Sequence, residues 1–106
     1  RERLAWKKTD VVTTFQSRFG PEEWLKPYTV KEVARLAKEG KKKIAVIAPA
    51  FSSDCIETLE EINEEIKESF ENAGGENFLY IPCLNDSSNH ISSLLGIIEE
   101  NLVGWL

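Results

Sequence analysis

Acidic side chains recur at helical spacing between Phe51 and Phe70, and this row is the part of the chain best suited to chemistry. The row comprises Asp54, Glu57, Glu61, Glu65 and Glu68. Residues three or four positions apart are neighbours on a helix, so Glu57 faces Glu61 and Glu61 faces Glu65. Each like-charged pair costs about 0.2–0.5 kcal/mol in an isolated helix. Such a row must be solvated by water or meet cations, and a path for cations would be a function.

The same residues also have structural interpretations. An aspartate at a helix start with a glutamate three positions later, as in Asp54 and Glu57, is a capping arrangement that complements the helix dipole. Glu61, Glu65 and Glu68 lie beyond the first turn, where the dipole contributes little, and spacing alone favours a solvated face. The spacing therefore leaves both interpretations open.

Composition narrows the possible classes of protein. The chain has 106 residues, of which 42% are apolar, enough for one compact domain. A net charge of -5 argues against a nucleic-acid surface, which needs a basic patch. The basic cluster Lys41–Lys43 is better interpreted as a solvated turn. The chain begins at Arg1 and contains no methionine, which indicates a piece of a longer or processed protein.

Cysteine usage and hydropathy bear on the cellular compartment. Cys55 and Cys83 lie far apart with no C-x-x-C spacing, as expected for two reduced thiols in a cytoplasmic protein. No signal peptide is evident, and no apolar run is long enough to span a bilayer. Membrane contact should be peripheral at most.

The segments that position the carboxylates alternate between strand and helix patterns. Strands are predicted over residues 11–15, 44–49 and 78–82, and the second is a continuous apolar run typical of a strand covered on both faces. A short helix is predicted from Pro21, and another from a capping box of Thr29 and Glu32 to Gly40. The acidic helix should bury an apolar stripe of Ile56, Leu59, Ile62, Ile66 and Phe70. A last helix, with its cap within residues 85–88, should bury a second stripe of Ile91, Leu94, Leu95, Ile98 and Leu102.

This order of elements, β-α-β-α-β-α, predicts an α/β fold. Crossovers of this length imply parallel strands with right-handed connections, here in a three-layer αβα domain. Ligands of such sheets bind beyond the carboxyl ends of the strands. Those ends are followed by residues 16–18, 49–54 and 82–86, which should meet at one edge, where the acidic helix begins.

Four segments carry a family resemblance in addition to these patterns. They are TFQSRFGPEEWLKPYT (residues 14–29), IAVIAPAFSSDCIETLEEI (44–62), AGGENF (73–78) and IPCLNDS (81–87). In this order they resemble the C-terminal half of ferrochelatase of the bacterial type. That enzyme is a lyase of haem biosynthesis that inserts ferrous iron into a porphyrin. The resemblance implies that residues 1–106 form a C-terminal chelatase-like domain, one Rossmann-like half of the enzyme.

The resemblance also implies roles for individual residues. Glu57 matches the active-site glutamate of the family, which exchanges protons or passes the metal. Glu61 and Glu65 match acidic residues that would guide the metal along the same helix face, and Asp54 matches the aspartate at the start of that helix. We expect all four of these carboxylates to contact the metal. The porphyrin-binding residues implied are Trp24, Gln16 and Ser17.

The expected chemistry fits these residue types. Metallation requires removal of the pyrrole N–H protons and dehydration of a divalent iron. A carboxylate in a partly dry pocket beside other carboxylates can have a raised pKa and exchange protons near neutral pH. Carboxylates in series can hold a divalent ion without trapping it. An aromatic wall, such as Trp24 could provide, suits a flat macrocycle.

The chain also departs from the family pattern. Many members have histidine at the position of Cys55, and the main catalytic histidine belongs to the N-terminal half, which is missing here. His90 cannot be mapped onto that histidine. The cysteines that bind an iron–sulfur cluster in some members are absent, so we expect no such cluster and no tightly bound cofactor. Ferrous iron would be a substrate.

Two other functions remain open from the sequence. The first is a related chelatase of another metal or another tetrapyrrole. The second is a non-enzymatic α/β module whose acidic helix docks a basic partner. An acidic face that opens into a cleft with Trp24 favours an enzyme, whereas a flat acidic face favours a docking module.

Overall fold

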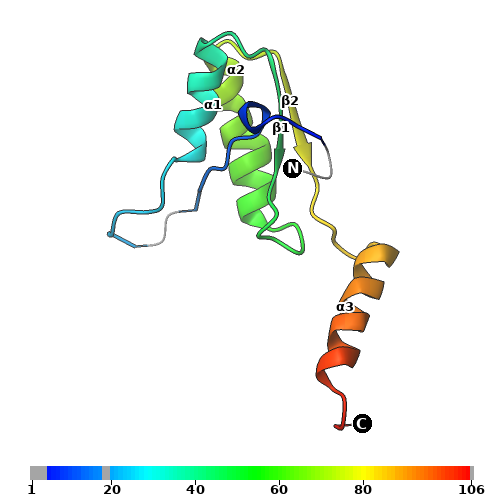
Figure 1. Cartoon of the computed structure of the whole chain (residues 1–106). Coiled ribbons are helices and arrows are strands. Elements are labelled where there is room, and N and C mark those ends of the chain that lie inside the picture. The colour runs from blue at the N-terminus through cyan, green and yellow to red at the C-terminus, as the bar shows by residue number, and fades with distance from the viewer. Residues whose placement is uncertain (1–4, 18–19, 106) are drawn as a thin grey trace.

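The computed structural model describes residues 5–17 and 20–105 (Figure 1). A short 3-10 helix, η2, spans Lys8–Asp10. The α/β part follows in the order α1 (Thr29–Lys38), β1 (Lys43–Ile47), η3 (Glu57–Ile66), α2 (Lys67–Asn72), β2 (Asn77–Ile81) and α3 (Ser88–Asn101). The π-helix η3 leads directly into α2, so the acidic segment forms one continuous helix.

The sheet consists of β1 and β2, which pair in parallel from Lys43 opposite Asn77 to Ile47 opposite Ile81. This arrangement confirms the predicted α/β class and the parallel pairing. One face of the sheet packs against the helical core through Ile44, Val46, Phe78 and Tyr80. The other face is open, with Ile47 and Leu79 each 60% exposed. The described residues therefore form two layers, and the third layer predicted from the sequence is not among them.

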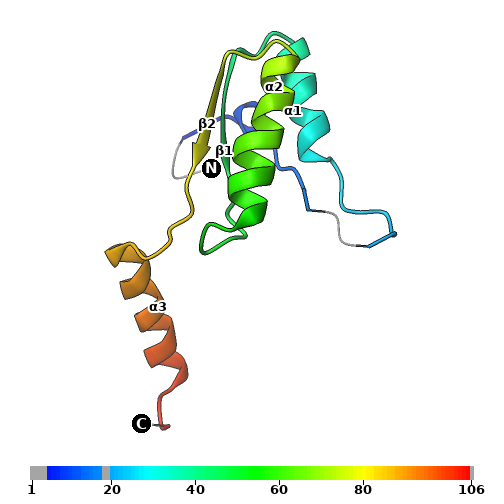
Figure 2. The ribbon, with the colours of Figure 1, turned by 180° about the vertical axis from the view of Figure 1, so that it is seen from behind.

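The core lies between α1, the acidic helix and the inner face of the sheet (Figure 2). Its buried apolar residues are Val33, Ala37, Ile62, Ile66 and Phe70. Burial of Val33 and Ala37 agrees with the helix predicted to end at Gly40, whose φ of +87° is the left-handed conformation common after a helix.

The acidic helix buries a different stripe from the one its sequence predicts. Thr58 is fully buried at the first turn of η3, and Ile62, Ile66 and Phe70 follow at intervals of four residues. Ile56 and Leu59, predicted to face inward, are 66% and 50% exposed. Leu59 lies in η3, whose i→i+5 hydrogen bonds give more residues per turn than an α-helix, whereas Ile56 precedes η3. The prediction assumed 3.6 residues per turn and was wrong at these two positions.

Two predicted elements near the N-terminus are absent from the described residues. Residues 11–15 form no strand. Among the described residues, the only β-pairing they make is the isolated bridge between Phe15 and Tyr28. Val11 and Val12 are exposed, so their β-branched side chains lack the packing that stabilises a strand. The segment from Pro21 to Tyr28 contains bends rather than a helix.

The predicted capping box at Thr29 is also wrong. Tyr28 is the N-cap of α1, and Thr29 is the first helical residue. The Thr29 hydroxyl donates a hydrogen bond to Thr14 Oγ1 at 2.9 Å instead of capping the helix. This contact ties α1 to the segment that leads into Gln16 and Ser17.

The last helix, α3, stands away from the rest of the molecule in both ribbon views (Figures 1 and 2). The side chains expected to form its buried stripe are exposed except for the half-buried Leu102: Ile91, Leu94, Leu95 and Ile98. The burial predicted for this stripe is therefore wrong for the chain as described. Within that part of the chain, no helix has the length and apolarity needed to cross a membrane.

Candidate functional site

A pocket of about 380 Å³ lies between the segment around residue 16, the loop before α1 and the acidic helix. Its lining includes Gln16, Ser17, Trp24, Glu61 and Glu65, all of which the sequence placed in a candidate site. Phe15, Tyr28 and Ile66 add apolar surface. The pocket thus brings an aromatic wall and carboxylates together from segments that are distant in sequence.

Hydrogen bonds fix the Gln16–Ser17 segment against the acidic helix. Ser17 Oγ donates to Glu61 Oε2 at 2.6 Å, and Gln16 Nε2 donates to the backbone oxygen of Glu57 at 2.9 Å. Ser17 has a φ of +57°, a left-handed conformation that is uncommon for a residue other than glycine. The segment therefore holds both the backbone at Glu57 and the side chain of Glu61.

Trp24 is anchored to the same segment. Its indole Nε1 donates a hydrogen bond to the backbone oxygen of Gln16 at 3.0 Å, and its side chain is half-buried. The bond fixes the indole as part of the pocket wall. Its role as a loop anchor and its predicted role beside a macrocycle are compatible, because one edge of the ring is bonded while the residue lines the pocket.

Glu57 is half-buried at the start of η3, and it is not among the residues that line the pocket. A hydrogen bond from the Cys55 side chain lowers the pKa of Glu57 below its ordinary value. Burial alone would raise the pKa of Glu57, and the hydrogen bond from Cys55 outweighs that effect. A carboxylate with a lowered pKa is ionised at neutral pH and available to a cation or a proton.

Asp54 occupies a different environment from the glutamates. Its Oδ1 accepts hydrogen bonds from Tyr80 Oη at 2.6 Å and Thr58 Oγ1 at 3.0 Å, and its Oδ2 accepts one from Asn85 Nδ2 at 2.8 Å. The backbone N–H of Cys83 donates to Oδ1 at 3.4 Å. The bonds from Tyr80 and Asn85 are the main reasons why the pKa of Asp54 lies far below its ordinary value.

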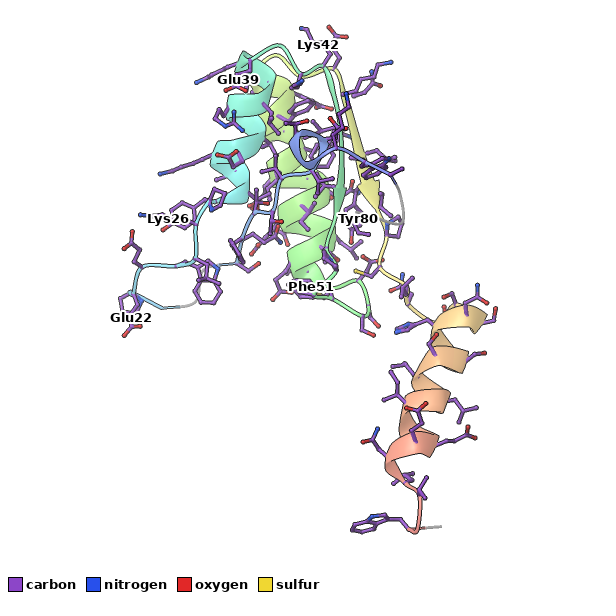
Figure 3. All side chains as sticks on the ribbon, in the orientation of Figure 1. Glu22, Lys26, Glu39, Lys42, Phe51 and Tyr80 are labelled. Atoms are coloured by element: carbon purple, nitrogen blue, oxygen red, sulfur yellow. The ribbon has the colours of Figure 1, made fainter. Side chains whose placement is uncertain are left out.

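These contacts make Asp54 a junction between the acidic helix and the residues at the end of β2. Figure 3 labels Tyr80, which lies on β2, and Phe51, which lies on the loop after β1 at the same end of the sheet. Burial and the bond to Asp54 raise the pKa of Tyr80, so its hydroxyl remains a donor. Both oxygens of Asp54 are used inside the protein, and its predicted contact with a metal has no support in this arrangement.

Sequence patterns missed the partners of Asp54. Tyr80 was assigned only to a strand and Asn85 only to a helix cap, and Thr58 had no assigned role. A hydroxyl-bearing residue within an apolar stripe is the one signal that could have identified Thr58. Burial raises the pKa of Cys83, so this thiol is not activated.

Glu57, Glu61 and Glu65 form a row, not a cluster. Among residues 5–17 and 20–105, no three histidine, cysteine or acidic side chains converge closely enough to hold a metal ion together. Glu61 is half-buried and Glu65 is exposed at the pocket. Such an arrangement suits brief contacts with a moving cation better than permanent binding.

His90 lies away from this pocket, at the start of α3. Its ring contacts Ser52 Oγ at 3.1 Å through Nε2 and the backbone oxygen of Asn85 at 2.6 Å through Nδ1. A backbone oxygen can only accept, so Nδ1 carries the proton. His90 therefore links α3 to the loops after β1 and β2.

Comparisons with known proteins identify the family of this chain. The family model described as Ferrochelatase matches residues 1–102. A ferrochelatase of Rhodobacter capsulatus is 66% identical over 106 residues, all of this chain and 30% of that protein. Ferrochelatases of Allorhizobium ampelinum and Chelativorans sp. are 58% and 55% identical over 106 and 105 residues, which are 31% and 30% of their lengths.

The chain spans under a third of the length of these curated relatives. No solved structure matched it. The family model covers nearly all of the chain, including the Gln16–Ser17 segment, Trp24 and the acidic helix. The identities extend over the same residues. This chain belongs to the ferrochelatase family.

Proposed function

We propose that this chain is the C-terminal domain of an enzyme that inserts ferrous iron into a porphyrin in haem biosynthesis. Its partners would be the porphyrin, ferrous iron and the remainder of the enzyme. The relatives named ferrochelatase are about three times as long as the chain, so the porphyrin site would be completed by the other part. A cytoplasmic location with at most peripheral membrane contact fits this proposal.

The pocket shared by Trp24, Ser17, Glu61 and Glu65 is the observation that carries this proposal. An aromatic side chain provides a flat apolar wall for a macrocycle, and carboxylates provide oxygen ligands for a divalent ion. A docking helix would instead present its acidic face openly to a partner. The hydrogen bond that Ser17 donates to Glu61 in the pocket wall favours the enzyme.

Within this proposal the carboxylates have distinct roles. Glu65, exposed at the pocket, would meet the hydrated iron first, and Glu61 would pass it inward. Glu57, whose pKa is lowered, would be ionised at neutral pH and would receive the ion or accept a pyrrole proton. Asp54 is left out of the path, because its oxygens already accept hydrogen bonds from Tyr80, Thr58 and Asn85.

The test uses the full-length protein that contains this chain, assayed anaerobically with ferrous iron and a porphyrin. Formation of haem is followed by its absorbance, and porphyrin affinity is measured separately by fluorescence quenching. We expect turnover in the unmodified protein and a loss of about 100-fold or more with Glu57→Gln, a size typical of losing one general acid–base group. Porphyrin affinity should be nearly unchanged. Normal turnover of the variant would contradict the role of Glu57.

The rival chelatase hypothesis is tested in the same assay. Cobalt, zinc, nickel and magnesium replace ferrous iron, and other tetrapyrroles replace the porphyrin. A higher kcat/KM with one of these than with ferrous iron would assign the chain to a related chelatase. Absence of metallation with every metal, together with binding of a basic protein to the acidic helix, would favour the docking module.

A further inference from the structure

We propose that Asn85 is a positioning residue that fixes the first turn of η3, and through it Glu57, relative to the end of β2. The effects on turnover that we expect from this role rest on the proposed function. Its structural content concerns the junction between Asp54 and Asn85, and it can be tested without any activity.

Every polar group of Asn85 is used in this junction. Its Oδ1 accepts a hydrogen bond from the backbone N–H of Asp54 at 2.8 Å, and its Nδ2 donates to Asp54 Oδ2 at 2.8 Å. Its backbone N–H donates to the oxygen of Ser52 at 3.0 Å, and its backbone oxygen accepts from His90 Nδ1 at 2.6 Å. Three of these bonds join Asn85 to the loop that leads into η3, at Ser52 and Asp54, and the fourth joins it to His90 on α3.

The chemistry of the pair specifies an amide at position 85. The backbone N–H of Asp54 can only donate, and its ionised carboxylate can only accept. A side chain that meets both groups needs one acceptor and one donor in a fork, which a carboxamide has. Asn85 also adopts a φ of +49°, and asparagine tolerates this left-handed conformation better than most residues. A glycine would retain this backbone and lose the fork.

The junction can transmit position to Glu57 because the connection is short. Asp54 lies three residues before Glu57, and its Oδ1 accepts a bond from Thr58, the fully buried residue next to Glu57. Gln16 holds the backbone oxygen of Glu57 from the opposite side at 2.9 Å. The first turn of η3 is thus fixed between two anchors, and Asn85 forms the one near the end of β2 together with Tyr80 and Cys83.

A turn-forming role alone would also explain an asparagine with positive φ. That interpretation predicts that glycine replaces Asn85 without loss, since glycine adopts φ near +49° without strain. It gives no reason for the two side-chain bonds to Asp54. The positioning role and the turn role therefore make opposite predictions for Asn85→Gly.

The experiment compares variants of the full-length protein. Asn85→Gly removes the fork and keeps the backbone. Asn85→Asp places two carboxylates in contact, and the pair Asp54→Asn with Asn85→Asp exchanges amide and acid. In the exchanged pair, the amide oxygen at 54 still accepts from Tyr80 and Thr58, and its NH2 group donates to the carboxylate at 85. Asn89→Asp, an exposed site on α3, is the matched charge control.

We expect Asn85→Gly to lower kcat by about 10- to 100-fold, the range for a misplacement of about 1 Å, with the porphyrin KM nearly unchanged. Hydrogen exchange in a peptide covering residues 54–62 should become faster. The exchanged pair should recover most of the turnover lost in Asn85→Asp, since it retains every bond of the junction. Asn89→Asp should match the unmodified protein in both readouts.

Three results would overturn the positioning role. They are normal kcat in Asn85→Gly, unchanged hydrogen exchange at residues 54–62 in that variant, and an exchanged pair no more active than Asn85→Asp. The last result would also indicate that the Asp54 carboxylate itself takes part in the chemistry. If the unmodified protein lacks metallation activity, the proposed function fails, and the exchange measurements still decide whether Asn85 fixes η3.

Discussion

At the scale of single residues, carboxylates with the same spacing have different surroundings. Glu61 accepts a hydrogen bond from Ser17 in the pocket, whereas the oxygens of Asp54 accept bonds from Tyr80 and Asn85 within the protein. Glu57 has a lowered pKa because the Cys55 side chain donates to it. Spacing on a helix identifies carboxylates that share a face, but the hydrogen-bond partners of each carboxylate determine whether its oxygens are free to meet a ligand.

The lowered pKa of Asp54 predicts a pH dependence of stability. A carboxyl group whose pKa is depressed on folding stabilises the fold above its ordinary pKa, and this contribution is lost as pH falls through the folded value. We expect the unmodified protein to be more stable than Asp54→Asn from neutral pH to about pH 5, with the difference shrinking below about pH 4. Urea unfolding at several pH values measures it, with the exposed Asp86 replaced by Asn as control. A difference that persists unchanged at pH 2 would contradict this account.

Five of the residues implied by the family resemblance line one pocket, while local patterns missed the junction at Asp54. Gln16, Ser17, Trp24, Glu61 and Glu65 gather as expected. Tyr80 and Asn85 lie 26 and 31 positions from Asp54, and no periodicity links residues at that distance. Contacts of this kind depend on how the strand ends meet, so only the folded chain reveals them.

At the scale of elements, the continuous helix formed by η3 and α2 carries a buried apolar side beside its acidic row. The buried side consists of Thr58, Ile62, Ile66 and Phe70. Each of the first three is directly preceded in sequence by a glutamate of the row: Glu57, Glu61 and Glu65. The buried residues and the carboxylates therefore both recur every four residues along the helix. A pattern search at 3.6 residues per turn finds the helix, but it misplaces Ile56 and Leu59.

The strand predicted over residues 11–15 failed for another physical reason. A strand is stabilised by its neighbours, and the described chain offers these residues only the bridge between Phe15 and Tyr28. The parallel pair β1–β2 formed where expected, because its inner face packs against the buried helix. Local propensity was therefore sufficient only where packing partners lie within the chain.

Packing at the end of α2 yields an element-scale prediction. A Cβ added at Gly75 would collide with the ring of Phe70, which is fully buried in the core. Overpacking of this kind typically costs about 1–3 kcal/mol, so Gly75→Ala should lower the free energy of unfolding by about that amount. Gly96→Ala is the matched control, because it lies in α3 with open space around it and alanine favours a helix.

Chemical denaturation of both glycine variants measures this difference. Gly75→Ala should unfold at a lower denaturant concentration than the unmodified protein. Gly96→Ala should unfold at an equal or higher concentration. Equal midpoints for the two variants would mean that the core around Phe70 adjusts freely, contrary to the packing described here.

At the scale of the whole molecule, apolar surface is left open in two places. One is the outer face of the sheet, with Ile47 and Leu79, and the other is α3, with Ile91, Leu94 and Leu95. Contiguous exposed apolar patches of several hundred Å² usually mark interaction surfaces. The relatives are about three times longer than this chain, which fits an enzyme whose other part would cover these faces.

The 106-residue chain on its own should therefore associate with itself as its concentration rises. Sedimentation velocity across a concentration series tests this expectation. Leu94→Glu with Leu95→Glu should shift association to higher concentrations, while Ser92→Glu on the same helix should leave it unchanged. A strict monomer up to millimolar concentration would weaken the proposal that another part of the enzyme covers these faces and completes the porphyrin site.

We propose that the pocket-facing carboxylates of the acidic helix handle the metal. Glu61 lines the pocket, whereas Glu64, three residues later, is exposed and outside it. The most direct test compares ferrous-iron kinetics of full-length Glu61→Gln and Glu64→Gln at saturating porphyrin. We predict that Glu61→Gln lowers kcat/KM for ferrous iron by about tenfold or more, since it removes a charge that in our proposal contacts the ion. Glu64→Gln should match the unmodified protein, and equal kinetics for the two variants would contradict the claim.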